Sequence, residues 1–457
     1  MKHLGFDIVW LVGVWESSPF SQKISQDEDF LRDFAKKTGN DISIIGSSVY
    51  SVKRYRLDPS FGFEWELKSL KEKLNSFGMK LLLDFVSNHM APDADFPEEC
   101  IDCFVLGTRE DYEKNKELFC EKIIGGKTYY IAHGKDPNFP PWKDTIQLNY
   151  FNPKTVERMI NELVKISEFC DGVRCDMVML TLNDIHESIW GWLLYKNGYK
   201  KPDTEFWHKA ISQVKEINPQ FIFIAEVYWG LEWKLQQLGF DYTYDKVFYD
   251  RLRHMGAEEI RGHLRAEKLY QKRSVRFIDN HDEEPSIVCF NNKSKALCAA
   301  VLMSTVRGLR FYNDMQLKGI GIKIPVQVLS FNIENYRDIE VEKFYEKLLK
   351  IVDHPAFHGG EWELIDVVPI TSEDRTYRNL IAYKWIQMRT LKIVVANYSN
   401  EVSSGRLIVS LKSKNDTVVL YEEFSERFFS YHVDEVSNGL VIKDLLPYGF
   451  LIFDHEF

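Results

Sequence analysis

Polar and ionisable residues gather at the carboxyl ends of four predicted strands. The four groups are Asp84 with Asn88 and His89, Arg174 with Asp176, Glu226 alone, and His281 with Asp282. Three carboxylates brought together repel one another and shift each other's pKa, so stability alone does not favour such an arrangement. Any one of these residues is better explained as a satisfied polar group or a surface charge. The ordered set instead predicts acid–base or nucleophilic chemistry by paired carboxyl groups.

The strands that carry these residues alternate with helical segments up to about residue 355. Apolar runs predict strands at 6–15, 80–85, 172–177, 221–228, 241–245, 275–280 and 309–313, with helices such as 64–77 and 153–170 between them. Alternating strands and helices predict a parallel sheet, because each parallel connection needs a long crossover. In a closed parallel barrel the carboxyl ends of the strands face one cavity. We therefore expect the four polar groups to converge.

Two regions depart from this alternation. About 65 residues between Asn88 and Pro153 are rich in Pro, Gly and acidic residues, and they are too many for an ordinary loop. After His354, short β-rich runs separated by Ser, Gly and Asn predict an antiparallel β-sandwich. The expected domains are thus 1–89 with 153–355, an inserted subdomain at 90–152, and a C-terminal domain at 356–457.

Four segments resemble the signature segments of the α-amylase superfamily of retaining glycosidases and transglycosidases, in order and spacing. They are DFVSNH at 84–89, GVRCD at 172–176, AEVY around Glu226, and NHD at 280–282. The stretch VYSVKRYRLDPSFG at 49–62 is similar to the family's tyrosine-bearing loop. The resemblance spans nearly the whole chain. It implies a TIM-type (β/α)8 barrel with a subdomain inserted after the third strand and a β-rich C-terminal domain.

The resemblance also implies residue roles. Asp176 would be the nucleophile, Glu226 the general acid and then the general base, and Asp282 would bind sugar hydroxyls and help to distort the ring. Arg174 would keep Asp176 ionised. Further substrate contacts are expected from Tyr50, Asp84, His89, His281 and Trp229. Trp142 and Trp233 could also shape the cleft, although core packing explains each tryptophan about equally well.

No organic cofactor is implied, but calcium is a candidate. Many relatives bind calcium between the barrel and the insertion, with the asparagine equivalent to Asn88 as one ligand. The remaining ligands cannot be identified from the residue pattern, because carboxylates and backbone carbonyls of a variable region would supply them.

The implied chemistry agrees with the residue pattern. Breaking a glycosidic bond with retention needs two carboxyl groups about 5 to 5.5 Å apart, one ionised and one protonated. Arg174 stands two residues before Asp176 on a strand, so both side chains point to the same face. A cation is thereby placed where it favours the charged aspartate.

Two features differ from the family pattern. Arg54-Tyr55 stands where the family usually has Asp-Tyr, so substrate preference cannot be carried over. GFDIVWL at 5–11 is similar to the family's second strand, which leaves seven countable parallel strands and no first strand. A barrel lacking one strand has two unpaired edges. We therefore expect that further residues precede Met1 in the native protein.

Composition and charge disfavour some classes of binding partner. The chain has 457 residues and a net charge of −10, which disfavours nucleic acid, and no apolar run is long enough for a membrane helix. Seven scattered cysteines predict no disulfide framework. Cys100-x-x-Cys103 could be a redox pair or half a metal site, but no second motif completes one. The first residues lack a secretory signal, so a cytoplasmic location is expected.

The leading hypothesis is a retaining α-glycoside hydrolase acting on α-glucans or malto-oligosaccharides. A transglycosidase or a glucoside isomerase would use the same covalent intermediate and remains an alternative. An alternative of another class is a non-catalytic carbohydrate-binding barrel, against which the retention of Asp176, Glu226 and Asp282 argues. The expected partner is an oligosaccharide or polysaccharide, and the oligomeric state is not predicted.

Overall fold

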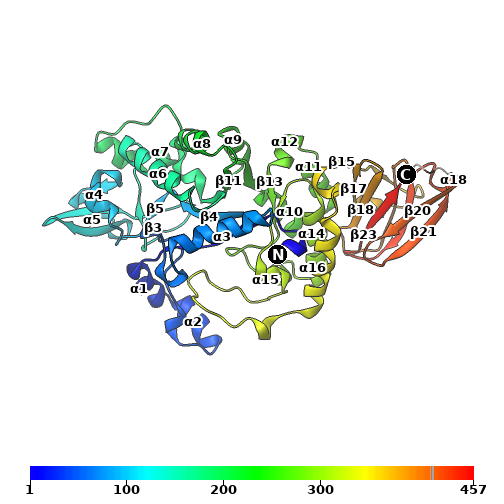
Figure 1. The fold of residues 1–457 in the computed structure, drawn as a ribbon, viewed down its shortest axis with the longest axis horizontal. Helices are drawn as coiled ribbons and strands as arrows, with labels where there is room; N and C mark the ends of the chain where they lie inside the picture. The colour runs from blue at the N-terminus through cyan, green and yellow to red at the C-terminus, as the bar shows by residue number, and fades with distance from the viewer. Residues whose placement is uncertain (412, 414–415) are drawn as a thin grey trace.

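A seven-stranded parallel sheet forms the centre of the larger part of the molecule (Figure 1). The computed structural model describes residues 1–411, 413 and 416–457. The strands lie in chain order, and every neighbouring pair is parallel. They are β1 (Ile8–Trp10), β4 (Lys80–Val86), β10 (Gly172–Asp176), β11 (Ile222–Ala225), β12 (Tyr242–Tyr244), β13 (Ser274–Arg276) and β14 (Leu309–Arg310).

The prediction of a β/α barrel with seven countable strands is confirmed. Among the described residues no strand joins β1 to β14, and a cavity of about 180 Å³ lies between these two edges. Several strands are shorter than predicted. The run 6–15 contains only β1 and the start of β2 (Trp15–Glu16), and the run 275–280 leaves the sheet after Arg276. The residues beyond the strand ends form the loops that line the cleft.

Helices pack on the sheet through apolar side chains; most bury one face, whereas α14 is buried nearly all round. In α6 (Pro153–Ile166) Asn152 caps the first turn, and Met159, Ile160, Leu163 and Ile166 are buried at helical spacing. The main covering helices are α3 (Glu64–Ser76), α6, α7 (Asn183–Lys196), α8 (Phe206–Ile217), α10 (Lys246–His254), α14 (Lys293–Thr305) and α16 (Ile339–Val352). No helix in the described ranges is both long enough and apolar enough to cross a bilayer.

The segment between β4 and α6 folds around its own small sheet. Strands β7 (Phe119–Ile124) and β6 (Leu106–Gly107) flank β8 (Lys127–Ala132) in an antiparallel arrangement. Strand β9 (Ile146–Gln147) returns to pair with β5 (His89–Met90), directly after β4. The segment is therefore tied to the barrel at the residues that directly follow β4. Its exact bounds, 90–152, remain a prediction.

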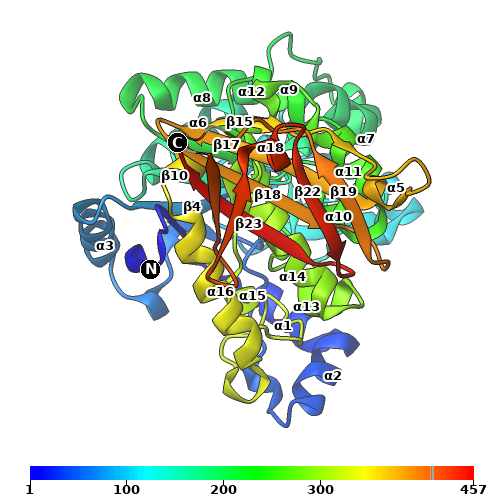
Figure 2. The same cartoon turned by 90° about the vertical axis from the view of Figure 1, so that its right-hand side faces the viewer.

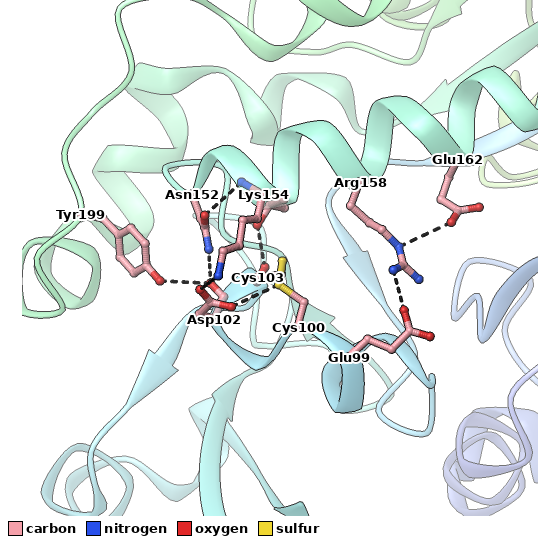
Figure 3. The surroundings of a disulfide bond; sticks show 10 residues. Glu99, Cys100, Asp102, Cys103, Asn152, Lys154, Arg158, Glu162 and Tyr199 are labelled. Carbon is pink, nitrogen blue, oxygen red and sulfur yellow. Dashed lines mark hydrogen bonds and ion pairs between the residues drawn. A yellow bond between two sulfur atoms is a disulfide. The ribbon is translucent and has the colours of Figure 1, made fainter.

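The cysteines require one correction. Cys100 and Cys103 are joined by a disulfide, whereas Cys120, Cys170, Cys175, Cys289 and Cys298 are free. The bonded turn is fixed to α6: the carbonyl of Asp102 accepts hydrogen bonds from Asn152 and Tyr199, and its carboxylate pairs with Lys154 at 2.9 Å (Figure 3). The sequence pattern could not distinguish this structural bridge from a redox or metal motif.

The C-terminal domain is an antiparallel sandwich that lies at one end of the barrel (Figures 1 and 2). Its two sheets have the orders β15-β17-β18-β23-β20-β21 and β16-β19-β22. The bounds are β15 (Glu361–Leu364), β16 (Val367–Val368), β17 (Leu380–Gln387), β18 (Thr390–Asn397), β19 (Ser403–Leu407), β20 (Thr417–Glu422), β21 (Arg427–His432), β22 (Leu440–Leu445) and β23 (Phe450–Glu456). Residues 412, 414 and 415 of the predicted domain 356–457 lie outside the described residues.

Alternation along β17 joins the sandwich to the barrel. Leu380 and Ala382 pack between the two sheets, whereas Tyr383 and Trp385 point to the other face and pack with the barrel core. The Trp385 indole donates a hydrogen bond to the carbonyl of Thr305, at the end of α14, at 2.7 Å. The two domains are thus connected by buried aromatic side chains.

We expect Trp385→Ala to lower the free energy of unfolding by about 3 to 5 kcal/mol, because it leaves a cavity and an unpaired carbonyl at this junction. Trp192→Ala, at a side chain that is 52% exposed, is the matched control and should change it by less than about 0.5 kcal/mol. Urea unfolding followed by circular dichroism measures both. Equal stability of the two variants would contradict the assigned packing.

Candidate active site

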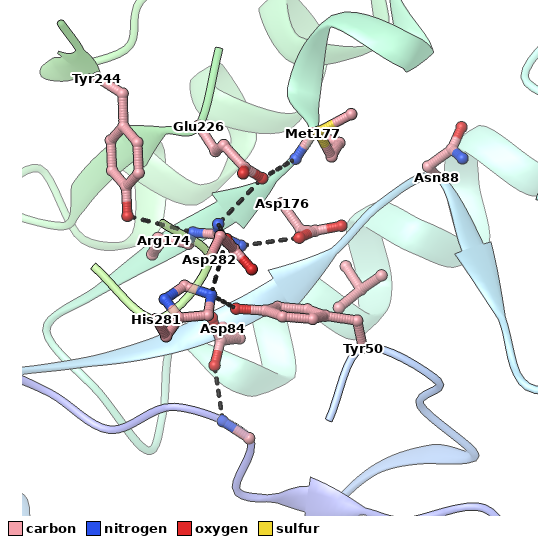
Figure 4. A network of polar contacts seen from close by, with 12 residues as sticks. Tyr50, Asp84, Asn88, Arg174, Asp176, Met177, Glu226, Tyr244, His281 and Asp282 are labelled. Atoms are coloured by element: carbon pink, nitrogen blue, oxygen red, sulfur yellow. Dashed lines mark hydrogen bonds and ion pairs between the residues drawn. The ribbon is translucent and has the colours of Figure 1, made fainter. Parts of the chain in front are cut away.

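The centre of the site is the buried side chain of Arg174 on β10. Arg174 is 1% exposed and lies beside Asp84 of β4 in the parallel register. Asp176, two residues further along, points to the same side of the strand (Figure 4). A buried guanidinium needs ionic partners, because its transfer from water is otherwise prohibitively costly.

Three carboxyl groups from three different strand ends supply those partners. Arg174 Nη1 donates to Asp176 Oδ1 at 2.8 Å, and Nη2 pairs with Glu226 Oε2 at 3.0 Å (Figure 4). Asp282 Oδ2 lies 3.9 Å from Nη2. The contact with Asp176 is an aligned hydrogen bond, whereas Nη2 forms none. The structure therefore brings together the three acids that the sequence predicted.

Aromatic rings enclose the guanidinium on its other sides. The ring centroids of Trp10 and Tyr50 lie 5.3 Å from the Arg174 Cζ, and that of Tyr244 lies 5.7 Å away. Contacts of a cation with ring faces are favourable and exclude water. The rings thus strengthen the electrostatic contacts of Arg174 with the carboxylates by lowering the local dielectric. The sequence pattern had not indicated Trp10 or Tyr244.

The carboxyl groups differ in their electrostatics. Burial raises the pKa of Asp176 well above the usual aspartate range, the negative charge of Glu226 adds to this, and Arg174 acts in the opposite direction. For Asp282, burial opposes ionisation, but His281 and Arg174 outweigh it and lower the pKa. Arg174 therefore does not keep Asp176 ionised by itself. Asp176 and Glu226 share one cation, and the charge of Glu226 acts directly on the ionisation of Asp176.

Two neighbours that the sequence did not reveal hold Glu226. The Met177 amide donates to Glu226 Oε2 at 2.7 Å, and the Tyr228 hydroxyl donates to Oε1 at 2.8 Å. Met177 adopts a left-handed conformation with φ of 41°, which is unfavourable for a residue other than glycine. This strained turn after β10 is what aims the amide at the carboxylate. Only the position directly after GVRCD could have suggested it.

His281 connects the predicted sugar-binding residues. Its Nε2 lies 3.0 Å from Asp282 Oδ2 and contacts the Tyr50 hydroxyl (Figure 4). The Tyr50 and His281 rings are 5.7 Å apart and inclined at 33°. Tyr50, from the loop before β3 (Arg54–Leu57), and the loop after β13 therefore form one wall beside the acids.

Asp84 is held by the protein itself. Its Oδ1 accepts from the Trp10 indole at 3.2 Å, and its Oδ2 accepts from the Gly13 amide at 2.8 Å. The side chain is 1% exposed. Its contacts fix the loop after β1 against β4, which supports a positioning role better than the predicted direct contact with substrate.

His89 and Asn88 lie at the junction with the inserted segment. Burial lowers the pKa of His89 to about 4, so its ring is neutral at physiological pH. The ring packs against Trp142 with centroids 5.3 Å apart. His89 can therefore offer a hydrogen-bonding nitrogen beside an aromatic surface.

Asn88, which the resemblance implies as a calcium ligand, is hydrogen-bonded to Gln147. Asn88 Oδ1 accepts a hydrogen bond from the Gln147 amide at 2.9 Å, and the Asn88 carbonyl accepts another at 2.8 Å. Calcium takes about six to eight oxygen ligands, from carboxylates, amide or backbone carbonyls and water. In the described part of the chain, the one cluster of three His, Cys, Asp or Glu donors is Cys100, Asp102 and Cys103, two of which form the disulfide. The predicted calcium ligand is thus used internally.

Trp229 lines a cavity next to Met177 and Tyr228, the two residues that hold Glu226. A space of about 630 Å³ is lined by Trp229, Tyr228, Met177, and Trp142 and Phe139 from the inserted segment. Trp229 is 43% exposed and has a left-handed φ of 66°. Trp233 is 44% exposed but does not line this cavity. Flat aromatic surfaces with adjacent polar groups suit sugar rings.

Arg54, which stands where the family usually has an aspartate, forms two ion pairs within the protein. Arg54 pairs with Glu16 at 3.3 Å and also with Asp95 of the inserted segment. The charge is therefore balanced within the rim, where it connects β3 to that segment.

The fold and the site together define a β/α-barrel protein with an arginine-centred cluster of three carboxyl groups at its mouth. Residues 1–314 match the catalytic domain of alpha amylase, so the chain belongs to the alpha-amylase family. The family's site is a glycoside hydrolase site.

Named relatives are distant. The chain is 24% identical over 407 residues to Alpha-amylase 3 of Dictyoglomus thermophilum, covering 77% of this chain and 74% of the relative. It is 21% identical to a 1,4-alpha-glucan-branching enzyme of Debaryomyces hansenii, covering 83% of this chain but 53% of that enzyme. These two relatives carry different activities in their names.

Solved structures confirm the fold. A maltogenic alpha-amylase from Thermotoga neapolitana superposes with a TM-score of 0.66 at 19% identity, and each chain is covered fully. An alpha-amylase from Lactobacillus plantarum gives a TM-score of 0.65 at 18% identity, covering 99% of this chain and 92% of that one. At such identities the likeness shows the architecture.

We expect Arg174→Met to lower the free energy of unfolding by about 3 to 5 kcal/mol at pH 8, because buried carboxylates then lose their cation. Without Arg174 the folded carboxyl groups bind protons more tightly than the unfolded chain does, so stability falls as the pH rises above about 4. The loss should therefore be smaller at pH 5, and Arg174→Lys, which keeps the charge, should lose less at pH 8. Thermal melting at both pH values measures this. An equal loss at both would contradict the electrostatic role.

Proposed function

We propose that this protein is a retaining α-glycosidase acting on α-glucans or malto-oligosaccharides through a covalent glycosyl-aspartate. The observation that supports the proposal is that Asp176 and Glu226 both contact the guanidinium of Arg174, which brings their carboxyl groups together. Retention requires two carboxyl groups this close together, because one must reach the anomeric carbon while the other reaches the departing oxygen.

In the first step Glu226 donates its proton to the glycosidic oxygen while the bond from that oxygen to the anomeric carbon breaks. An Asp176 oxygen forms an ester bond to the same carbon. The aligned hydrogen bond from Arg174 goes to Asp176, which stabilises its ionised, attacking form. Tyr50, His281 and Asp282 would hold the ring of the sugar being transferred.

In the second step Glu226 takes a proton from an incoming hydroxyl, which attacks the anomeric carbon. The ester bond breaks, and the carboxylate of Asp176 is restored. Two inversions give net retention. Met177 and Tyr228 keep Glu226 in place through both steps.

A transglycosidase is the second candidate, and the cavity of about 630 Å³ favours it. The cavity lies beside Tyr228 and Met177, which hold Glu226, and Trp229 and Trp142 offer surfaces for an acceptor sugar. Incubation with maltotetraose separates the alternatives. Products longer than the substrate support sugar as acceptor, whereas glucose and maltose alone support water.

We expect Glu226→Gln to reduce kcat/KM for maltotetraose by about 10²- to 10⁴-fold, the range for loss of a general acid. On an α-glucosyl fluoride, whose leaving group needs no proton, the same variant should lose much less in the first step. Asp176→Asn should be impaired on both substrates, because both need the nucleophile. Steady-state and burst kinetics provide the measurement.

Serine substitution of a nearby free cysteine is the control for these variants. Cys175 lies between Arg174 and Asp176 on β10 and is buried on the opposite face, so Cys175→Ser should keep activity if it folds. Near-normal turnover of maltotetraose by Asp176→Asn would contradict the proposal.

The acid limb of the pH profile of kcat/KM should lie at a higher pH than an ordinary aspartate would give. Burial and the charge of Glu226 raise the pKa of Asp176, and Asp176 must be ionised to attack, so activity is lost as the pH falls through this raised value. Rates on an α-glucosyl fluoride, whose leaving group needs no proton, measure this limb. An acid limb in the range of an exposed aspartate would contradict Asp176 as its origin.

A further inference from the structure

Three large aromatic side chains are exposed at the rim of the barrel mouth. Phe61, Phe63 and Trp65 are 62%, 67% and 64% exposed, and they follow β3 at the start of α3. None of them belongs to a hydrophobic core cluster of the described residues. Exposing three such rings gains nothing for folding, and exposed aromatic surface of this kind marks a site of contact with another molecule.

The rings form an ordered surface. The Phe63 and Trp65 rings are nearly parallel, inclined at 12° with centroids 6.5 Å apart. We refer to Phe63 and Trp65 as the rim pair. The two rings are stacked on each other, and the side chains are 67% and 64% exposed, so their outer faces remain open to the apolar face of a sugar ring.

The backbone beneath the rim pair is rigid. The Phe63 amide donates to Glu66 Oε2 at 2.9 Å, which fixes the first turn of α3. Asp58 caps the preceding turn by accepting from the Ser60 amide at 3.0 Å. Between them Gly62 has a φ of 113°, a conformation that a residue with a side chain rarely adopts. A preformed site of this kind loses little conformational entropy on binding.

Phe61 connects the rim pair to the active site. It lines a cleft of about 380 Å³ that also contains Asn280 and His281 of the loop after β13. Five serines are among the residues that line this cleft, Ser17, Ser47, Ser48, Ser51 and Ser60. The hydroxyls of Ser17, Ser47, Ser51 and Ser60 donate to acceptors within the protein, which leaves their oxygens able to accept from the hydroxyl groups of a sugar. The cleft therefore gives a continuous path from His281 to Phe61, next to the rim pair.

We infer that the rim pair is a second binding site for α-glucan, occupied by a chain that leaves the active site through this cleft and passes Phe61. The inference rests on the proposed function, since it takes the ligand from it. The charged neighbours are of both signs, because Arg56 pairs loosely with Glu64 at 4.0 Å, so neither an anionic nor a cationic partner is favoured.

The size of the patch also argues against a protein partner. A stable protein interface buries about 800 Å² on each side. A fully covered aromatic side chain buries ~150–250 Å². Three such side chains, each only partly exposed, therefore offer less area than one side of a stable protein interface. An aromatic surface of this extent matches a few sugar residues.

The test combines Phe63→Ala with Trp65→Ala, in otherwise unchanged protein and in the Asp176→Asn background. In that background, native gel electrophoresis through amylopectin measures binding without turnover. We expect the double variant to bind amylopectin about tenfold more weakly, the loss that two aromatic contacts produce. In the active protein the ratio of kcat/KM for amylopectin to that for maltotriose should fall by a similar factor.

Controls separate the role of the rings from side effects. Trp192→Ala, in an exposed tryptophan of α7, should leave amylopectin retention unchanged. Phe63→Tyr combined with Trp65→Tyr keeps the rings and should keep binding. Retention of the alanine variant equal to that of the parent would overturn the inference, as would a change in oligomeric state without loss of retention, which would make the rim pair a self-association surface.

Failure of the proposed function is distinguishable from failure of this inference. If the protein turns over no α-glucan but binds amylopectin through the rim pair, the inference stands while the enzyme proposal fails. If it turns over maltotriose and amylopectin with no dependence on the rim pair, the enzyme proposal stands and the inference is overturned.

Discussion

The charge balance around Arg174 is the constraint on which the rest of the site depends. One guanidinium, 1% exposed, contacts Asp176, Glu226 and Asp282, which come from three strand ends far apart in the chain. The cation makes three neighbouring acids tolerable, and the acids make a buried cation tolerable. The same contacts bring together the two carboxyl groups that the proposed mechanism uses, those of Asp176 and Glu226. Stability and the proposed chemistry therefore depend on the same ion cluster.

The barrel supplies the strand ends, but loops set the geometry. Met177, in a strained left-handed turn, and Tyr228 hold both oxygens of Glu226. The Asp84 carboxylate accepts hydrogen bonds from the Trp10 indole and the Gly13 amide, and these contacts hold the loop after β1 against β4. Polar residues around the acids are thus mostly bonded to one another. Such a prearranged site needs little reorganisation when charge develops in a transition state.

Sequence patterns predicted the parts of the structure that follow from local periodicity and strand direction. Seven parallel strands, the helix at Pro153 and the convergence of Asp176, Glu226 and Asp282 all follow from those rules. Two features depend on which residues of distant strands face inward. One is that Arg174 contacts several carboxyl groups at once, and the other is that the rings of Trp10 and Tyr244 surround its guanidinium. Asn88, the predicted metal ligand, accepts a hydrogen bond from Gln147, and this contact depends on the fold of a variable insertion. No spacing rule encodes such contacts.

The most direct measurement is the identification of the residue that becomes covalently glycosylated. Glu226→Gln slows release of the intermediate, so incubation with a fluorinated α-glucosyl fluoride should trap it, and mass spectrometry of proteolytic peptides then locates the added mass. The account predicts one glucosyl group on the peptide containing Asp176, lost when Asp176→Asn is added. Attachment at Asp282 or at another carboxylate, or turnover without any adduct, would contradict it.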